Sequence, residues 1–212
     1  MEKAFGSTVI IHYDYEGTYF DSFGTEAQPG EEMSSISVIR FSTPLGSMFA
    51  GAVDSGICLL EFGDRRSLST ELNELSKLFK ARIRYCDHPY FDDLGRQLDE
   101  YFIGDRQKFD LPLFAPGSDF QKKVWDRLLQ IPYGETTTYG KLALELDNPG
   151  SVRAVGKANG SNRISIIIPC HRVIGEDGSL TGYGGGLKRK RWLLDFEAKN
   201  TGKAMQLRLP FD

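Results

Sequence analysis

The chain has 212 residues, 40% of them hydrophobic and 26% charged, which fits a globular protein of one or two domains. No apolar run approaches the roughly 20 residues of a membrane helix, and the first residues lack the features of a secretory signal, so we expect a cytoplasmic protein without a membrane partner. Three cysteines without a CxxC pair, together with three histidines, argue against a disulfide framework and a four-ligand zinc site, so we expect no metal and no cofactor.

The net charge of −3 conceals an asymmetry along the chain. Residues 1–116 carry 11 basic and 19 acidic side chains, a net of −8, whereas residues 117–212 carry 15 and 10, a net of +5. A basic second half can attract a polyanion, although an asymmetry of this size also arises in proteins that never meet one.

The first half predicts an extension followed by a small α+β domain. Residues 1–35 are acidic and show no sustained periodicity, which indicates an N-terminal extension of uncertain order. We place the N-terminal domain at 36–113, where a three-stranded meander precedes a helix, a further strand and a second helix. The expected strands are 36–41, 48–53, 57–62 and 81–85, and the expected helices lie around 72–79 and 89–102.

The second half predicts a helical domain. A linker at 114–118 contains Pro116 and Gly117, and we place the domain at 117–198 with a tail at 199–212. Asp119 is the expected N-cap of a first helix. The apolar residues expected to be buried by this helix are Phe120, Val124, Trp125 and Leu128.

Two short helices follow, separated by a tight turn at 147–150 that contains Pro149 and Gly150. Thr138 opens the first, which runs to Leu146, and Ser151 opens the second, which ends near residue 159. This pattern predicts a helix-turn-helix, whose second helix meets DNA, or else an ordinary helical hairpin.

A β-branched run at 164–168 predicts a buried strand or an extended segment leading into the core, which Pro169 ends. Cys170 follows directly, beside His171 and Arg172, whose imidazole and guanidinium favour the thiolate over the thiol. The alternative is that Cys170 is a small buried hydrophobe, the commoner fate of a free cysteine. Core positions are also expected for the other two thiols, Cys58 and Cys86.

The segment Ile168-Pro169-Cys170-His171-Arg172-Val173-Ile174 resembles the active-site signature of the O6-alkylguanine-DNA alkyltransferases, also called methylated-DNA-protein-cysteine methyltransferases. Further motifs agree in order and spacing over essentially all of residues 117–198. They are Tyr133-Gly134-Glu135-Thr136-Thr137-Thr138-Tyr139, Arg153-Ala154-Val155-Gly156, Asn162, Gly182-Tyr183-Gly184-Gly185-Gly186-Leu187 and Trp192-Leu193-Leu194. The resemblance implies an α+β fold, with a small antiparallel sheet in the N-terminal domain and a mostly helical C-terminal domain containing a helix-turn-helix.

The resemblance also implies direct-reversal DNA repair. The alkyl group of O6-alkylguanine, and also of O4-alkylthymine, would move stoichiometrically to Cys170 and inactivate the protein. Displacement at saturated carbon needs a soft nucleophile, and a free thiol is only a few per cent ionised at neutral pH, so a base is expected nearby. In the family this base is the histidine after the cysteine, acting through a water and oriented by a glutamate 27 residues after the cysteine, which here are His171 and Glu197.

By the same resemblance, Tyr139 donates a proton toward the departing guanine, and Asn162 ties the helix-turn-helix to the active-site turn. Arg153 would fill the gap left by an extruded nucleotide, because a buried thiol cannot reach a stacked base. Plainer interpretations stay open: His171 as a core histidine, Glu197 and Arg153 as solvated charges, and Tyr139 as a packing residue.

The resemblance implies that a monomer binds double-stranded DNA through the minor groove with the alkylated base flipped out, which would place a bacterial protein at the nucleoid. Small residues on the second helix would allow close approach of the backbone: Ala154, Gly156, Ala158 and Gly160. The substrate pocket would be formed by Asn159, Val173, Tyr183 and Gly184. Gly184 departs from relatives with a hydroxyl residue there, which puts one guanine-oxygen hydrogen bond in doubt.

Two other functions fit part of the pattern. Cys170, His171 and Glu197 have the residue types of a cysteine hydrolase triad, but a hydrolase explains neither Arg153 nor the helix-turn-helix. A damage-binding module like the alkyltransferase-like proteins would lack the acceptor cysteine, which is present here.

Overall fold

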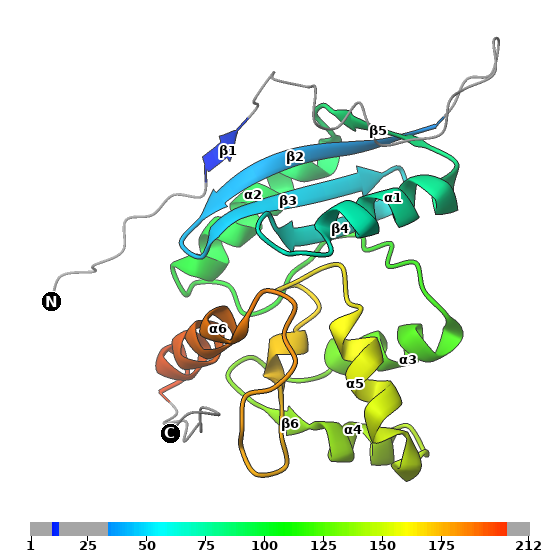
Figure 1. The fold of residues 1–212 in the computed structure, drawn as a ribbon. Helices are drawn as coiled ribbons and strands as arrows, with labels where there is room; N and C mark the ends of the chain where they lie inside the picture. Colours follow the sequence, from blue (N-terminus) through cyan, green and yellow to red (C-terminus); the bar gives the residue numbers. More distant parts are fainter. Residues whose placement is uncertain (1–9, 13–33, 203–212) are drawn as a thin grey trace, which may run out of the picture. The chain divides into compact units, whose positions relative to one another are not determined.

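The computed structural model describes residues 10–12 and 34–202, and the chain divides into two compact units, Met1–Phe114 and Ala115–Asp212, each of which is considered by itself (Figure 1). Most of the extension expected at 1–35, and most of the tail expected at 199–212, lies outside the described residues.

The first unit is built around one sheet. Its strands β2 (Ser35–Thr43), β3 (Gly46–Val53) and β4 (Gly56–Phe62) form the predicted antiparallel meander, which is confirmed. β5 (Arg82–Tyr85) pairs in parallel with the first half of β2. β1 (Ile10–His12), which the sequence did not indicate, pairs antiparallel with the second half of the same strand.

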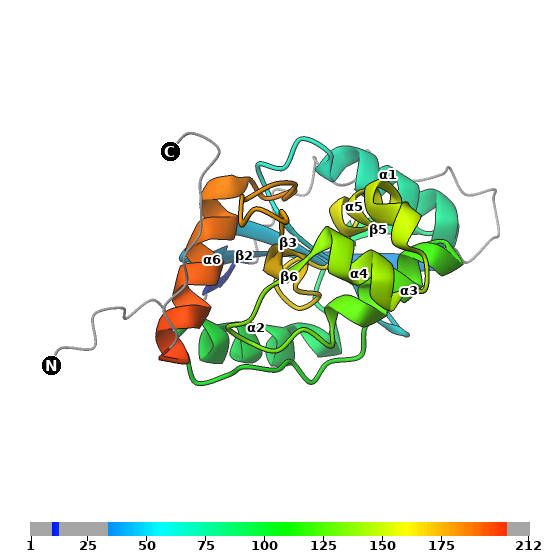
Figure 2. The ribbon, with the colours of Figure 1, turned by 90° about the horizontal axis from the view of Figure 1, so that it is seen from below.

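The two helices of this unit cover opposite faces of the sheet (Figures 1 and 2). They are α1 (Leu68–Phe79) and α2 (Pro89–Phe102), and the predicted bounds of α2 are confirmed. Leu72 and Leu75 of α1 pack in one cluster with Ile36 and Cys58, so Cys58 is a core thiol as expected. The same expectation was wrong for Cys86, which is only partly buried. On the other face the ring of Phe91 from α2 meets Phe41 edge-on. Alternation along β2 therefore supplies both halves of the core.

The second unit is mostly helical. Its longer elements are α3 (Asp119–Leu128), α4 (Tyr139–Glu145), α5 (Val152–Gly160) and α6 (Leu187–Asn200), with short elements β6 (Thr137–Thr138), η1 (Pro149–Ser151), η2 (Cys170–Arg172) and β7 (Val173–Ile174). The gold segment around residue 170 lies between α6 and the group α3 to α5 in both views (Figures 1 and 2). With the sheet of the first unit, this confirms the predicted α+β fold.

The expected N-cap of α3 was wrong by one residue. Ser118, not Asp119, has the extended backbone of an N-cap, and its hydroxyl accepts a hydrogen bond from the backbone N–H of Gln121. The Gln121 side chain in turn accepts from the Ser118 N–H, which completes a capping box. Asp119 is the first helical residue, where its charge complements the helix dipole. Val124, Trp125 and Leu128 are buried as predicted, whereas Phe120 is only partly buried.

The expected strand at 164–168 is also wrong. The segment is buried but forms a turn, in which the N–H of Ile168 donates to the Ile164 carbonyl at 3.0 Å and Ile166 has a φ of +73°. The side chain of Asn162 takes the place of a neighbouring strand: its oxygen accepts from the Ile164 N–H at 2.9 Å and its amide donates to the Ile168 carbonyl at 2.9 Å. Backbone groups of a buried segment need partners, and here the Asn162 side chain supplements the backbone hydrogen bonds of the turn.

The two short helices α4 and α5 pack against each other across the turn that contains η1. Thr138 caps α4 as predicted, because its hydroxyl accepts from the N–H of Lys141 at 3.1 Å. Among the residues that the structure describes, no helix is both long enough and apolar enough to cross a membrane.

Candidate active site

Cys170 opens the short helical turn η2 and is almost completely buried, with 4% of its surface exposed. Two asparagines from the helix-turn-helix side hold it. The Asn162 amide donates to Sγ at 3.2 Å, and the Asn159 amide donates to the Cys170 carbonyl at 3.4 Å. Both asparagines are themselves buried, so the thiol sits in a fixed position at the end of α5.

The neighbouring His171 pairs with Glu197 from α6. Nε2 of His171 lies 2.9 Å from Oε1 of Glu197, and both side chains are completely buried. Burial lowers the pKa of His171, and the nearby carboxylate offsets this only in part. Nδ1, the other ring nitrogen, is buried and has no hydrogen-bond partner among the described residues.

Arg172 binds the same carboxylate. Its Nε donates to Oε2 of Glu197 at 2.9 Å and its Nη2 to Oε1 at 3.0 Å, while Nη1 donates to the Ile131 carbonyl at 2.7 Å. Burial on its own would raise the pKa of Glu197, but the charges and hydrogen bonds of His171 and Arg172 outweigh it and hold that pKa well below its usual range. The guanidinium therefore acts on Glu197, whereas the sequence had suggested an effect on the thiol.

Lys190 is a site residue that the sequence did not identify. It belongs to a basic run on α6 that predicts a solvated face, yet its surface is 0% exposed. Its Nζ donates to the carbonyls of Val173 and Thr181, both at 2.5 Å, and lies 5.9 Å from the centroid of the Tyr139 ring. Burial lowers the pKa of Lys190 to about 8, with the charge of Cys170 opposing the shift.

Tyr139 and Tyr183 are partly buried and contact this cluster. The Tyr139 hydroxyl donates to the carbonyls of Thr181 and Gly182, at 3.2 and 3.4 Å, and burial raises its pKa. The Tyr183 ring meets His171 edge-on, with 6.4 Å between ring centroids. The loop that contains Gly182 and Tyr183 therefore lies beside His171. The side chain of Val173 is buried.

Helix α5 presents two different sides. Arg153, Ala154 and Gly160 are exposed, whereas Ala158 is buried, with its carbonyl accepting from the indole N–H of Trp125 at 2.9 Å. A Cβ on Gly156 would lie 3.9 Å from the Tyr139 ring, so this glycine faces α4. Ala158 thus serves packing, unlike the exposed positions expected for close approach of DNA.

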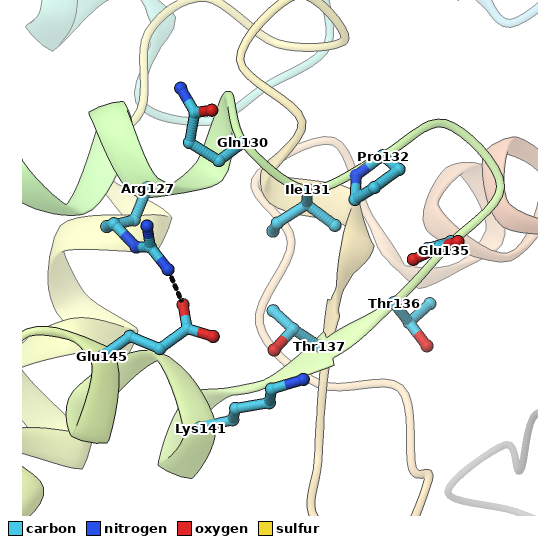
Figure 3. A pocket seen from close by; sticks show the side chains of 9 residues that line it. All are labelled: Arg127, Gln130, Ile131, Pro132, Glu135, Thr136, Thr137, Lys141 and Glu145. Atoms are coloured by element: carbon cyan, nitrogen blue, oxygen red, sulfur yellow. Dashed lines mark hydrogen bonds and ion pairs between the residues drawn. The ribbon is translucent and has the colours of Figure 1, made fainter.

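A separate pocket of about 120 Å³ lies between α3, β6 and α4 (Figure 3). Its walls carry two cations and two carboxylates, and Arg127 and Glu145 pair across it at 2.5 Å. The lining residues are Arg127, Gln130, Ile131, Pro132, Glu135, Thr136, Thr137, Lys141 and Glu145. None of the predicted site residues lines it. Within the described part of the chain, no cluster of His, Cys, Asp and Glu side chains could hold a metal ion.

Comparisons with known proteins identify the family of the chain. A family model described as the DNA-binding domain of 6-O-methylguanine DNA methyltransferase matches residues 119–199, and one described as its ribonuclease-like domain matches residues 39–115. The chain is 53% identical over 157 residues to the methylated-DNA–protein-cysteine methyltransferase of Methanosarcina acetivorans, covering 74% of this chain and 95% of the relative. Identity to the protein of that name from Mycobacterium bovis is 48% over 147 residues, 68% of this chain and 89% of the relative.

Solved structures give the same result. The O6-methylguanine methyltransferase of Mycobacterium tuberculosis superposes with a TM-score of 0.65 at 40% identity, covering 78% of this chain and 93% of that one. The structure of Mycobacterium tuberculosis OGT in complex with DNA matches with a TM-score of 0.65 at 40% identity, over 78% and 94% of the two chains. The chain therefore belongs to the methylated-DNA–protein-cysteine methyltransferase family.

Proposed function

We propose that this protein repairs DNA by transferring the alkyl group of O6-alkylguanine, and of O4-alkylthymine, to Sγ of Cys170 in a single turnover. The observation that carries the proposal is the buried thiol, fixed by Asn162 at 3.2 Å and followed by a histidine whose far nitrogen is paired with Glu197. A base and a nucleophile in this arrangement, in a chain of this family, suit a displacement at saturated carbon.

The chemistry balances without a cofactor. His171 takes the Cys170 proton through a water, the thiolate forms the S–C bond, and the C–O bond breaks with its electrons left on the guanine. Tyr139 supplies a proton to the departing base, for which its hydroxyl must leave the Thr181 carbonyl that it binds at 3.2 Å. The proton held by His171 then returns to the Tyr139 phenolate, so both residues end as they began. A thioether is a stable product, so each molecule acts once.

The DNA-binding part of the proposal rests on α5. Its exposed Arg153 can enter the base stack while the exposed Ala154 and Gly160 allow the backbone to approach the minor groove. The flipped base would then lie near the cysteine, between Asn159, Val173 and the loop with Tyr183 and Gly184. We further propose that the protein acts as a monomer in the cytoplasm, with domains at 36–113 and 117–198.

The test is to incubate the protein with a short duplex that carries one O6-methylguanine and then to measure the mass of the peptide that contains Cys170. We expect one methyl group on Cys170 and an end to activity after one equivalent of DNA. Cys170→Ala should bind the duplex and transfer nothing. Multiple turnovers with an unmodified cysteine would indicate a hydrolase instead, and tight binding without transfer would indicate a damage sensor.

A further inference from the structure

The carboxylate of Glu197 is surrounded by hydrogen-bond donors. Arg172 supplies two N–H groups to its two oxygens at 2.9 and 3.0 Å, the backbone N–H of Gly134 adds a third at 3.1 Å, and Nε2 of His171 lies 2.9 Å from Oε1. A proton on this carboxyl group would have to compete with these donors, so Glu197 is ionised and acts only as an acceptor.

An acceptor at Oε1 decides where the proton of His171 lies. Neutral imidazole carries one N–H, and the nitrogen that faces an ionised carboxylate is the one that donates. The proton therefore lies on Nε2, and the lone pair lies on Nδ1, the buried nitrogen without a partner among the described residues.

The charge of Arg172 is needed for this state. Glu197 alone beside His171 would favour the imidazolium, which has no lone pair with which to accept a proton. Arg172 neutralises the carboxylate with its positive charge, delivered through two parallel hydrogen bonds. Nη1 of Arg172 donates to the Ile131 carbonyl at 2.7 Å, which holds the guanidinium in place against Glu197.

We propose that Arg172 is a positioning residue that fixes the proton of His171 on Nε2 and keeps Nδ1 able to accept the proton of Cys170. This inference rests on the proposed function. The charged and titratable groups around His171 are Glu197 and Lys190 on α6, Cys170 and Arg172 on η2, and Tyr183 in the adjoining loop. Both Arg172 and Lys190 act to lower the pKa of His171, and Glu197 acts to raise it.

The experiment combines imidazole NMR with a pH profile. Protein with ¹⁵N-labelled histidine is prepared as wild type, Arg172→Gln and Arg172→Lys, and the His171 signals are assigned by their loss in His171→Gln. The rate of Cys170 alkylation by free O6-benzylguanine is measured by mass spectrometry from pH 6 to 9. A matched control is Arg191→Gln. It breaks an exposed arginine–carboxylate pair on α6, the helix that carries Glu197, between Arg191 and Asp195 at 2.7 Å.

Wild-type His171 should be neutral at pH 7 with its proton on Nε2. Arg172→Gln should protonate His171 at neutral pH, move the midpoint of the rate profile to higher pH, and lower the rate at pH 7 on the order of tenfold, with recovery as the pH rises. Arg172→Lys should retain the neutral ring and a midpoint close to wild type, while Arg191→Gln should change neither.

An equal loss of rate at every pH, with the neutral ring retained in Arg172→Gln, would overturn the proposal. If Arg172→Gln does not fold, the wild-type spectrum decides alone, because a proton on Nδ1 at pH 7 contradicts the proposal. Failure of the proposed function is a different outcome: wild type would then leave Cys170 unmodified, while the NMR result still tests Arg172.

Discussion

The Tyr139 hydroxyl donates to the carbonyl of Thr181 at 3.2 Å, and the same carbonyl accepts from Nζ of Lys190 at 2.5 Å. A helix-turn-helix residue and a buried lysine of α6 therefore hold one point of the pocket loop. Lys190 also binds the Val173 carbonyl, directly after the active-site turn. The loop is thus tied to the two elements that place the proposed proton donor and the nucleophile.

Gly182→Ala should disturb this arrangement. Gly182 has a φ of +56°, and an added Cβ would lie 3.0 Å from the Tyr139 hydroxyl oxygen. We expect a stability loss of about 1–2 kcal/mol from the left-handed backbone, and a slower reaction of Cys170 with O6-benzylguanine because Tyr139 is displaced. Stability is measured by urea unfolding and the rate by mass spectrometry.

Gly178→Ala is the matched control, because Gly178 has a φ of +80° in the same segment but an added Cβ meets nothing within 4 Å. It should lose similar stability and keep its rate. Equal rates in the two variants would contradict the role of Tyr139.

Asn162→Ala should destabilise the protein and slow the reaction. The substitution removes the partner of the Ile164 N–H, one of the two donors to the Ile168 carbonyl, and the donor to Sγ of Cys170. Buried backbone groups without partners cost about 1–3 kcal/mol, which urea unfolding would detect. Asn73→Ala, at an exposed position of α1, should change stability by less than about 0.5 kcal/mol. A similarly small change in Asn162→Ala would contradict this account of the turn.

Much of the fold could be predicted because its signals are local. The bounds of α2 follow from apolar spacing after Pro89, and the meander follows from β-rich runs between turns. The turn at 164–168 could not be predicted in this way, since its β-branched residues favour a strand, whereas side-chain hydrogen bonds from Asn162 and backbone hydrogen bonds within the segment hold a turn. These hydrogen bonds override the β preference of the individual residues there.

The site residues also divide into those that the sequence could predict and those that it could not. Cys170, His171 and Glu197 could be named because their spacing matches a family motif, and the structure brings the last two to 2.9 Å. Lys190 could not, because a basic residue in a basic run gives no sign that carbonyls from Val173 and Thr181 surround it. Ala158 was placed on the DNA side of α5, although its contact with Trp125 turns it inward.

Stability should fall with acid because of His171. Burial lowers the pKa of His171 from 6.5, so the unfolded chain binds a proton that the folded protein does not. The stability that the neutral folded ring provides is full above about pH 6.5 and is lost as the pH falls, with a slope of up to about 1.4 kcal/mol per pH unit. Glu197, whose pKa is also lowered, adds a further loss below pH 4.5, its ordinary value.

Urea unfolding between pH 5 and 7.5 measures this slope. His171→Gln should show a shallower slope than wild type, since the amide can still donate to Glu197 but does not titrate. Asn73→Ala should retain the wild-type slope. Parallel curves for wild type and His171→Gln would show that the ring is not kept neutral.

Arg153→Ala should separate DNA recognition from chemistry. Arg153 is exposed on α5, so its removal should change stability by less than about 0.5 kcal/mol. If the side chain fills the gap left by a flipped base, the variant should repair O6-methylguanine in duplex DNA at least about tenfold more slowly, since unstacking a base costs a few kcal/mol. Reaction with free O6-benzylguanine needs no flipping and should keep its rate. Arg66→Ala, an exposed arginine of the first unit, should keep both rates. Equal losses on both substrates in Arg153→Ala would mean that Arg153 acts on the reaction itself and not on the DNA.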